Sequence, residues 1–389
     1  YVGSVTETDL MNPDKKYYRD EVIGKTGLEY QYDNYLRGKP GIKTVIVDRK
    51  EAVTEQTQNS IPYPGDDLIT NLNVQLQGAT EKALEKSVLS ARSQGYHADG
   101  GAAIVMDVKS GKILALASYP TYSLDIFQKG LTQAEAKALF SDSTGVPALN
   151  RALQGMYAPA STFKSISIVA ANAAGYNLQG RYDCPADVKI GNRVFKNFET
   201  SPMGAIPMQT AIAVSCDTVW YKIAYDEWVR DGGLRPHSSP NDYFFNAAKE
   251  FNLGKVTGID LPDEASGRLP DRQWKLDYYK QNKDFYCNFE SRAKKSDLTP
   301  YLIAIAKENC TDGYIVRAGD AVNFSIGQGD TLMTPIQMAV TYSAIANGGK
   351  IWQPWVARAI VDPKGKVVKE FQKNSIGSAP LTPAVTTFL

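Results

Sequence analysis

The stretch Tyr157–Ile166 reads YAPASTFKSI and places Ser161 three residues before Lys164. Pro159 disfavours a helix before this point, and a run rich in Ala, Ile and Val follows over residues 165–174. The pattern therefore predicts a buried helix that begins at or near Ser161. Side chains at positions i and i+3 of a helix share one face, with Cβ atoms roughly 5–6 Å apart. The spacing thus brings a hydroxyl and an amine together.

This pair can act as a serine nucleophile and its base without a histidine. A lysine in an apolar setting has a lowered pKa and can accept a proton, and the positive end of a helix favours a developing oxyanion. Taken alone, Ser161 could instead cap a core helix and Lys164 could form a salt bridge. The two histidines, His97 and His237, lie in polar segments and are interpreted as loop residues, and no G-x-S-x-G motif occurs. A Ser-His-Asp hydrolase is therefore disfavoured.

The same S-x-x-K spacing occurs a second time, at Ser291 and Lys294. It lies in the polar run 288–297, with no apolar helix behind it. Charge runs of this kind are usually solvated. We interpret this second pair as part of a solvated loop, so the context favours Ser161.

Length and composition indicate a folded globular protein with two domains. The chain has 389 residues, of which 43% are hydrophobic and 22% charged. A net charge of +1 gives no support for nucleic acid as a partner. No apolar run reaches the ~18 residues of a membrane-spanning helix, and no signal peptide is visible at Tyr1. We expect a chain that begins with Tyr1 to be a trimmed or processed fragment.

The four cysteines are Cys184, Cys216, Cys287 and Cys310, and none forms a C-x-x-C pair, so we expect no metal site. Cys287 and Cys310 flank one polar insertion. In an oxidising compartment they could form a disulfide that stabilises the fold by roughly 3 kcal/mol on the loop-entropy model. The alternative is two free cysteines.

Periodicity and turn residues predict a sheet with helices packed on it, an α+β or α/β arrangement. A polar, aromatic insertion is expected over residues 271–318. The predicted elements are a strand at 44–48, a helix at 74–93, a hairpin at 100–118, one or two helices at 206–227, helices at 242–251 and 334–346, and a hairpin at 356–371.

Six groups of residues, spread over almost the whole chain, resemble the signatures of class B penicillin-binding proteins, the monofunctional peptidoglycan D,D-transpeptidases. Ser161-x-x-Lys164 resembles the family's first catalytic motif and Ser215-x-Asp217 its second. The other groups are Gly24-x-x-Gly27-Leu28-Glu29 with Leu36-Arg37-Gly38, Pro64-Gly65-x-Asp67-Leu68 with Leu76-Gln77, Met106-Asp107 with Ala115–Pro120, and Ile326–Gly329 with Thr334–Met338.

The resemblance implies a serine β-lactamase-like transpeptidase domain, with an antiparallel sheet and flanking helices, preceded by an elongated N-terminal pedestal. We expect residues 1–92 to form a truncated pedestal of the dimerisation type with its linker. Residues 93–389 are expected to form the transpeptidase domain without its C-terminal part.

Asp217 stands where many members of the family have Asn, and this favours the elongation-type branch, usually called PBP2. The segments Thr257–Leu261 and Glu264–Pro270 also resemble that branch. Ala160 departs from the family, which usually has Gly before the nucleophile. The third family motif, K-[ST]-G, matches only at Lys25–Gly27 and Lys109–Gly111, both before Ser161, and we reject both matches. We expect the true motif to be missing from this fragment, or the site to be incomplete.

The resemblance also implies a mechanism and partners. Ser161 would attack the D-Ala-D-Ala carbonyl of a stem peptide, Lys164 would act as base, and Ser215 would relay a proton to the leaving D-Ala. Asp217 would pair with Lys164, raising its pKa, or orient the substrate. β-Lactam antibiotics would acylate Ser161, and no cofactor is needed.

The expected location is outside the cytoplasmic membrane, with an anchor upstream of Tyr1 and a SEDS-family glycosyltransferase as partner. The alternatives are a serine β-lactamase or D,D-carboxypeptidase, against which the pedestal-like first 90 residues argue. A further alternative is a catalytically silent scaffold or sensor, which the missing third motif favours.

Overall fold

The computed structural model describes residues 2–13, 15–127, 131–294 and 298–389. The chain forms two compact units, each with most of its residue contacts within itself. The first contains residues 1–155, 257–264 and 352–376, and the second contains residues 156–256, 265–351 and 377–389. Both units are therefore built from segments that are far apart in the sequence.

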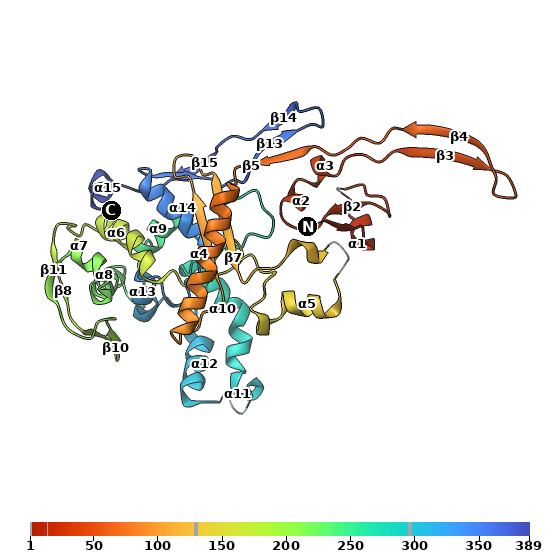
Figure 1. Cartoon of the computed structure of the whole chain (residues 1–389). Helices are drawn as coiled ribbons and strands as arrows, with labels where there is room; N and C mark the ends of the chain where they lie inside the picture. The colour runs from red at the N-terminus through yellow and green to blue at the C-terminus, as the bar shows by residue number, and fades with distance from the viewer. Residues whose placement is uncertain (1, 14, 128–130, 295–297) are drawn as a thin grey trace. The chain divides into compact units, whose positions relative to one another are not determined.

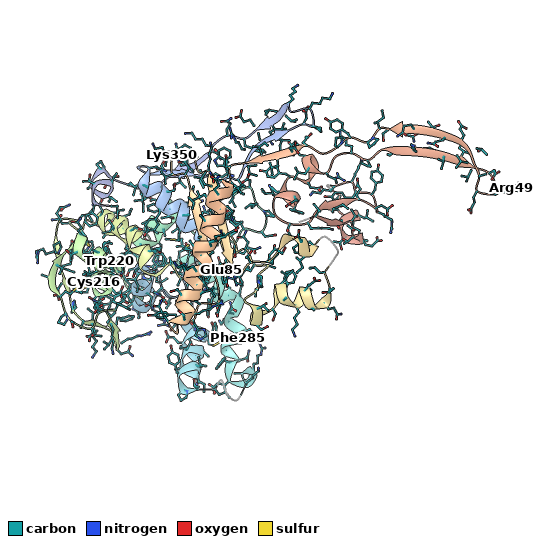
Figure 2. All side chains as sticks on the ribbon, viewed as in Figure 1. Arg49, Glu85, Cys216, Trp220, Phe285 and Lys350 are labelled. Carbon is teal, nitrogen blue, oxygen red and sulfur yellow. A yellow bond between two sulfur atoms is a disulfide. The ribbon has the colours of Figure 1, made fainter. Side chains whose placement is uncertain are left out.

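The first unit begins with small elements and a long hairpin. Strand β3 pairs with β4 in an antiparallel ladder whose side chains are almost all exposed, and Arg49 lies at its tip (Figure 2). The elements in this part are β1 (Val2–Ser4), α1 (Glu7–Leu10), β2 (Val22–Gly24), α2 (Gly27–Gln31), α3 (Asp33–Leu36), β3 (Ile42–Val47) and β4 (Val53–Ser60).

The rest of the first unit contains helix α4 (Val74–Ser93) beside the antiparallel hairpin of β6 (Gly101–Met106) and β7 (Ile113–Tyr119), as Figure 1 shows. Asn73 caps α4 by accepting a hydrogen bond from the Leu76 N–H at 2.9 Å. Strands β5 (Asp67–Thr70), β13 (Ala357–Val361) and β14 (Val367–Glu370) form a second antiparallel sheet. The remaining elements are η1 (Leu124–Phe127), α5 (Gln133–Phe140) and η2 (Asp142–Thr144).

The second unit is mainly helical, and its core surrounds the apolar helix α6. Trp220 on α8 is fully buried in this core, one turn beyond Cys216 (Figure 2). Its elements are η3 (Ala160–Phe163), α6 (Lys164–Ala173), β8 (Arg181–Cys184), β9 (Asp187–Ile190), β10 (Arg193–Lys196), β11 (Gly204–Pro207), α7 (Met208–Ala213), α8 (Asp217–Arg230), α9 (Tyr243–Glu250), α13 (Ala318–Ser325), α14 (Pro335–Ala346) and α15 (Pro383–Phe388). Strands β12 (Lys350–Trp352) and β15 (Ser375–Ser378) each cross a boundary between the units in sequence.

The insertion at 271–318 is a helical hairpin in which α10 (Arg272–Cys287) lies against α12 (Pro300–Asp312). A disulfide joins Cys287 to Cys310, the pair that the sequence analysis named as a candidate disulfide. Ser291 lies in the short helix α11 (Phe289–Arg292), so the expectation of a loop was wrong at this residue, although its side chain is exposed. The end of the polar run, residues 295–297, lies outside the described residues.

Within the described part of the chain, no helix is both long enough and apolar enough to cross a membrane.

Candidate active site

Ser161 lies in the 3₁₀ turn η3, which continues directly into α6 at Lys164. Phe163, between them, is completely buried and contacts the ring of Phe324 edge-on, with 5.0 Å between ring centroids. Every residue from Lys164 to Ala171 is buried, whereas Ser161 is exposed. The packing of α6 thus fixes the turn and leaves the Ser161 side chain accessible.

The backbone before Ser161 is strained. Ala160 has φ +49°, in the left-handed region that L-residues with a Cβ rarely adopt. Its N–H donates to the carbonyl of Gly327 at 3.0 Å. Gly327 itself has φ +67°, and a Cβ there would lie 2.6 Å from the Phe163 Cβ. The glycine at 327 is therefore required for this close approach to the serine turn.

Ser215 lies between helices α7 and α8, and it too has a positive φ, +55°. This conformation turns its hydroxyl toward the first motif, so that Ser215 Oγ lies 2.7 Å from Ser161 Oγ. The two hydroxyls are 54 residues apart in the sequence.

Lys164 Nζ has three hydrogen-bond partners in the second motif. They are Ser215 Oγ at 2.8 Å, the Ser215 carbonyl oxygen at 2.9 Å, and Asp217 Oδ1 at 2.5 Å. No hydrogen bond among the described residues joins Lys164 Nζ directly to Ser161 Oγ, so Ser215 stands between them. A neutral amine would donate to the two acceptor-only oxygens and accept from the Ser215 hydroxyl, whereas an ammonium would donate to all three. The same geometry therefore satisfies both protonation states.

Burial lowers the pKa of Lys164, and the neighbouring Asp217 carboxylate opposes this by raising it. The side chain of Lys164 is only 2% exposed, against 14% for Asp217. Loss of hydration is the larger effect, so the net pKa lies below the ordinary lysine value of 10.5. The balance favours a lysine that can give up its proton.

Asn197 holds the second motif in place through hydrogen bonds. Its side-chain oxygen accepts a hydrogen bond from the Asp217 N–H at 2.9 Å, and its amide nitrogen contacts Cys184 Sγ at 3.4 Å. Cys184, on β8, forms a disulfide with Cys216, the residue between Ser215 and Asp217. Both cysteines are completely buried. The second motif is thus tied covalently to the neighbouring β8–β11 sheet.

Two family models match the chain. One, described as the penicillin-binding protein transpeptidase domain, matches residues 101–383, and the other, the penicillin-binding protein dimerisation domain, matches residues 1–70. The chain belongs to the penicillin-binding protein transpeptidase family.

Curated relatives point the same way. The peptidoglycan D,D-transpeptidase MrdA of Acinetobacter baumannii is 28% identical over 97% of this chain and 48% of its own length. Penicillin-binding protein 2A of Bacillus subtilis is 28% identical over 90% of this chain and 42% of its own. The chain spans about half the length of the curated relatives it matches.

Solved structures confirm the predicted fold. A chain of a peptidoglycan synthase complex, described as coordinating polymerization and crosslinking, has a TM-score of 0.74 and 28% identity over 100% of this chain and 59% of its own. PBP2 of Helicobacter pylori, solved in a complex with MreC, has a TM-score of 0.72 and 24% identity over 100% of this chain and 59% of its own, which supports the fold alone.

Two features of this penicillin-binding protein were not predicted from its sequence: the Cys184–Cys216 disulfide and the position of Asn197 beside the second motif. The available signal was the even number of cysteines: once Cys287 and Cys310 are paired, only these two remain. Nothing in the sequence marks Asn197.

The residues set aside in the sequence are not part of this site. The two rejected K-[ST]-G matches lie in the first unit. In one of them Thr26 precedes helix α2, and the other, Lys109–Gly111, forms the turn between β6 and β7. His97 is fully exposed, and His237 contacts the Arg230 carbonyl at 3.1 Å. The described residues contain no cluster of side chains suited to a metal ion.

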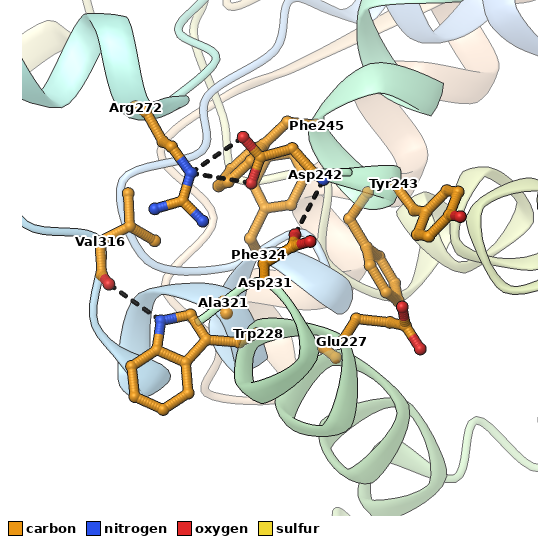
Figure 3. A pocket seen from close by; sticks show the side chains of 12 residues that line it. Glu227, Trp228, Asp231, Asp242, Tyr243, Phe245, Arg272, Val316, Ala321 and Phe324 are labelled. Carbon is orange, nitrogen blue, oxygen red and sulfur yellow. Dashed lines mark hydrogen bonds and ion pairs between the residues drawn. The ribbon is translucent and has the colours of Figure 1, made fainter. Parts of the chain in front are cut away.

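The second unit also contains the small cavity shown in Figure 3. Its volume is about 30 Å³, close to that of a single water. Its acidic groups already have partners, since Arg272 Nε contacts Asp242 at 2.9 Å and the Asp242 N–H donates to Asp231 at 2.9 Å (Figure 3). We assign it no ligand.

Proposed function

We propose that this chain carries the acyl-transfer centre of a penicillin-sensitive peptidoglycan D,D-transpeptidase, with Ser161 as nucleophile. The observation that carries the proposal is the hydrogen-bonded series from Ser161 Oγ through Ser215 Oγ to the buried Lys164 Nζ. Such a series gives a serine an adjacent base, as nucleophilic catalysis requires.

In the acylation step, Ser161 Oγ forms a bond to the carbonyl carbon of the penultimate D-Ala. Its proton passes to Ser215 Oγ, while the Ser215 proton moves to neutral Lys164. The C–N bond to the last D-Ala then breaks, and the proton returns from Lys164 through Ser215 to the departing amine. The positive end of the serine turn stabilises the tetrahedral oxyanion.

In the transfer step, the amine of a second stem peptide attacks the ester carbonyl of the acyl-enzyme. The attacking amine loses its proton to Lys164 through the hydroxyl of Ser215. Ser161 then leaves and recovers a proton, and the product is a new amide cross-link. Asp217 keeps Lys164 in place during both steps, since its carboxylate accepts from Nζ at 2.5 Å.

The test is a reaction of the full-length protein with a donor peptide that ends in D-Ala-D-Ala and a peptide amine as acceptor. Release of D-Ala and formation of the cross-linked product would be followed by mass spectrometry. Lys164→Met should lower both by roughly 10²–10⁴-fold, since it removes the base. Hydrolysed donor without cross-link would indicate a carboxypeptidase, and neither product would favour a silent scaffold.

We also propose the elongation-type role, with residues 1–92 as pedestal and 93–389 as transpeptidase domain. The dimerisation-domain match at 1–70, the transpeptidase match at 101–383 and the MrdA relatives support these assignments.

We further propose a membrane-anchored protein whose catalytic domain is extracytoplasmic and which works beside a SEDS-family glycosyltransferase. Support for a synthase partner comes from the likeness to a chain of a peptidoglycan synthase complex. Co-purification of the full-length protein with that glycosyltransferase would test the partnership.

A further inference from the structure

The second unit contains a cleft of about 690 Å³ that the chemistry described above does not use. Its walls come from the segment before the nucleophile, from the end of α9, from residues 266–271 and from the first turns of α10. The lining residues that bear on the choice of ligand are Lys249, Lys255, Arg268, Asp271, Trp274 and Asp277. A volume of this size accommodates part of a peptide.

Arg268 is held in place in this cleft. Its Nε donates to the Asp330 carbonyl at 2.6 Å, and its guanidinium lies over the Trp274 ring, 5.5 Å from the centroid. The Trp274 ring in turn stacks on Tyr278, with 4.9 Å between the ring centroids. No hydrogen bond among the described residues involves the two terminal nitrogens of Arg268. A fixed guanidinium with both terminal nitrogens available matches the two oxygens of a carboxylate.

The charges of the cleft leave a positive excess. Lys249 forms an ion pair with Asp271 at 2.6 Å, and Asp277 accepts from Gln273 at 2.9 Å. In the described part of the chain, no carboxylate lies within ion-pair distance of Arg268 or Lys255. The two unpaired cations therefore favour an anionic ligand.

The wall that bears Lys255 is rigid. Gln337 on α14 is 1% exposed, and its amide donates to the carbonyls of Lys255 at 2.7 Å and Ser266 at 2.8 Å. Gly267 packs so closely that a Cβ there would lie 2.6 Å from the Gln337 side-chain oxygen. A buried glutamine thus preorganises the cleft.

The cleft is connected to the nucleophile through the backbone. Arg268 pairs with Leu332, and the next residue, Met333, pairs with Tyr157. Two strand spacings of ~4.8 Å put the backbones of Arg268 and Tyr157 about 10 Å apart. Ser161 follows Tyr157 by four residues, at most ~14 Å of extended chain. These spans match the length of a short stem peptide.

We propose that this cleft binds a carboxylate of the peptide substrate through Arg268 and Lys255. The proposal rests on the proposed transpeptidase function and names a recognition site for its substrate. The carboxylate belongs either to the donor peptide that acylates Ser161 or to the acceptor peptide that resolves the acyl-enzyme. The chemistry of recognition is the same for both.

The experiment uses the full-length protein with pairs of synthetic stem peptides that differ only in a side-chain carboxylate or its amide. One arm varies the donor and measures D-Ala release, and the other varies the acceptor and measures cross-link formation. We expect the wild type to prefer the carboxylate form by about tenfold or more in one arm, the usual effect of a charge-assisted hydrogen bond. That arm identifies the peptide bound.

Arg268→Gln and Lys255→Gln should each reduce this preference, whereas Lys189→Gln, an exposed lysine on β9, should not. Among the described residues, no hydrogen bond or ion pair involves the Lys255 side chain, so Lys255→Gln serves as a second test should Arg268→Gln misfold. Penicillin acylation should stay within about twofold in all three variants.

Equal use of both peptide forms by the wild type, or an unchanged preference in both cleft variants, would overturn the cleft proposal while penicillin acylation persists. A wild-type protein that neither releases D-Ala nor reacts with penicillin would overturn the proposed function and the cleft's role with it.

Discussion

Two opposed effects act on the pKa of Lys164, the residue that we propose as the base. Burial favours its neutral form, and the Asp217 carboxylate favours the charged form. The first effect is larger, so the lysine can act as a base, while Asp217 limits how far its pKa falls. In the proposed mechanism, an aspartate at this position therefore adjusts the pH range of the reaction.

Asp217→Asn should move the acid limb of the acylation rate to lower pH. Acylation needs neutral Lys164 and is lost as pH falls through its pKa. Removing the carboxylate removes the influence that raises this pKa, and burial then acts unopposed. The second-order rate of penicillin acylation, measured against pH, checks the prediction. Asp226→Asn, an exposed acid on the same helix, serves as the control, and an unmoved or upward-shifted limb in Asp217→Asn would contradict it.

Ala160→Gly should stabilise the second unit by up to about 1 kcal/mol. A left-handed conformation costs an L-residue about 1–2 kcal/mol, and the extra freedom of glycine in the unfolded chain offsets part of the gain. Urea denaturation would measure the change. Ala213→Gly, at an exposed helical position of α7, should instead cost roughly 0.5–1 kcal/mol. Equal losses in both variants would argue against strain at Ala160.

At the scale of elements, the sequence predicted best the helices with strong local signals. The predicted helix 74–93 matches α4, whose start is set by the Asn73 cap, and 334–346 corresponds to α14, which begins with a Thr334–Gln337 capping box. Strands β8–β11 were missed because each has only four residues, several of them charged or exposed. Helix α13 was missed because Gly319 and Asp320 lie in its first turn.

The site was predictable only in part. Ser161 and Lys164 lie on one turn, so their proximity follows from local geometry. The approach of Ser215, and the need for glycine at 327, arise from contacts between segments more than 50 residues apart. Local patterns carry no information about such contacts, which is also why Asn197 was not found.

The two disulfides should differ in their effect on the reaction. Replacing Cys184 and Cys216 by alanine removes the covalent tie of the second motif, so penicillin acylation should fall and the thermal midpoint should drop. The loop-entropy model gives a loss of roughly 3–4 kcal/mol for either loop. Replacing Cys287 and Cys310 should cost similar stability but leave acylation near its original rate, because that pair lies in the insertion. Equal acylation by both double variants would refute a positioning role for Cys184–Cys216.

At the scale of the whole molecule, length and composition indicated two domains, and the structure has two compact units. Their segments interleave, since residues 257–264 and 352–376 join the first unit. Strand β13 provides the reason, because it pairs with β5 almost 300 residues earlier. The single boundary between residues 92 and 93 stays a proposal.

The molecule should react with penicillin once and release it slowly. The Asp217 carboxylate already accepts a hydrogen bond from Lys164, and this pairing weakens it as a base that could activate a water for deacylation. Absorbance of a chromogenic β-lactam should show a burst of about one equivalent followed by slow turnover. Sustained rapid hydrolysis would instead indicate a β-lactamase.

The most direct measurement is the intact mass of the protein with excess penicillin, followed by peptide mapping, for the wild type, Ser161→Ala and Ser291→Ala. We predict a single adduct on Ser161 in the wild type, none in Ser161→Ala, and an unchanged adduct in Ser291→Ala. An adduct that persists without Ser161, or disappears when only Ser291 is replaced, would contradict the assignment of the nucleophile.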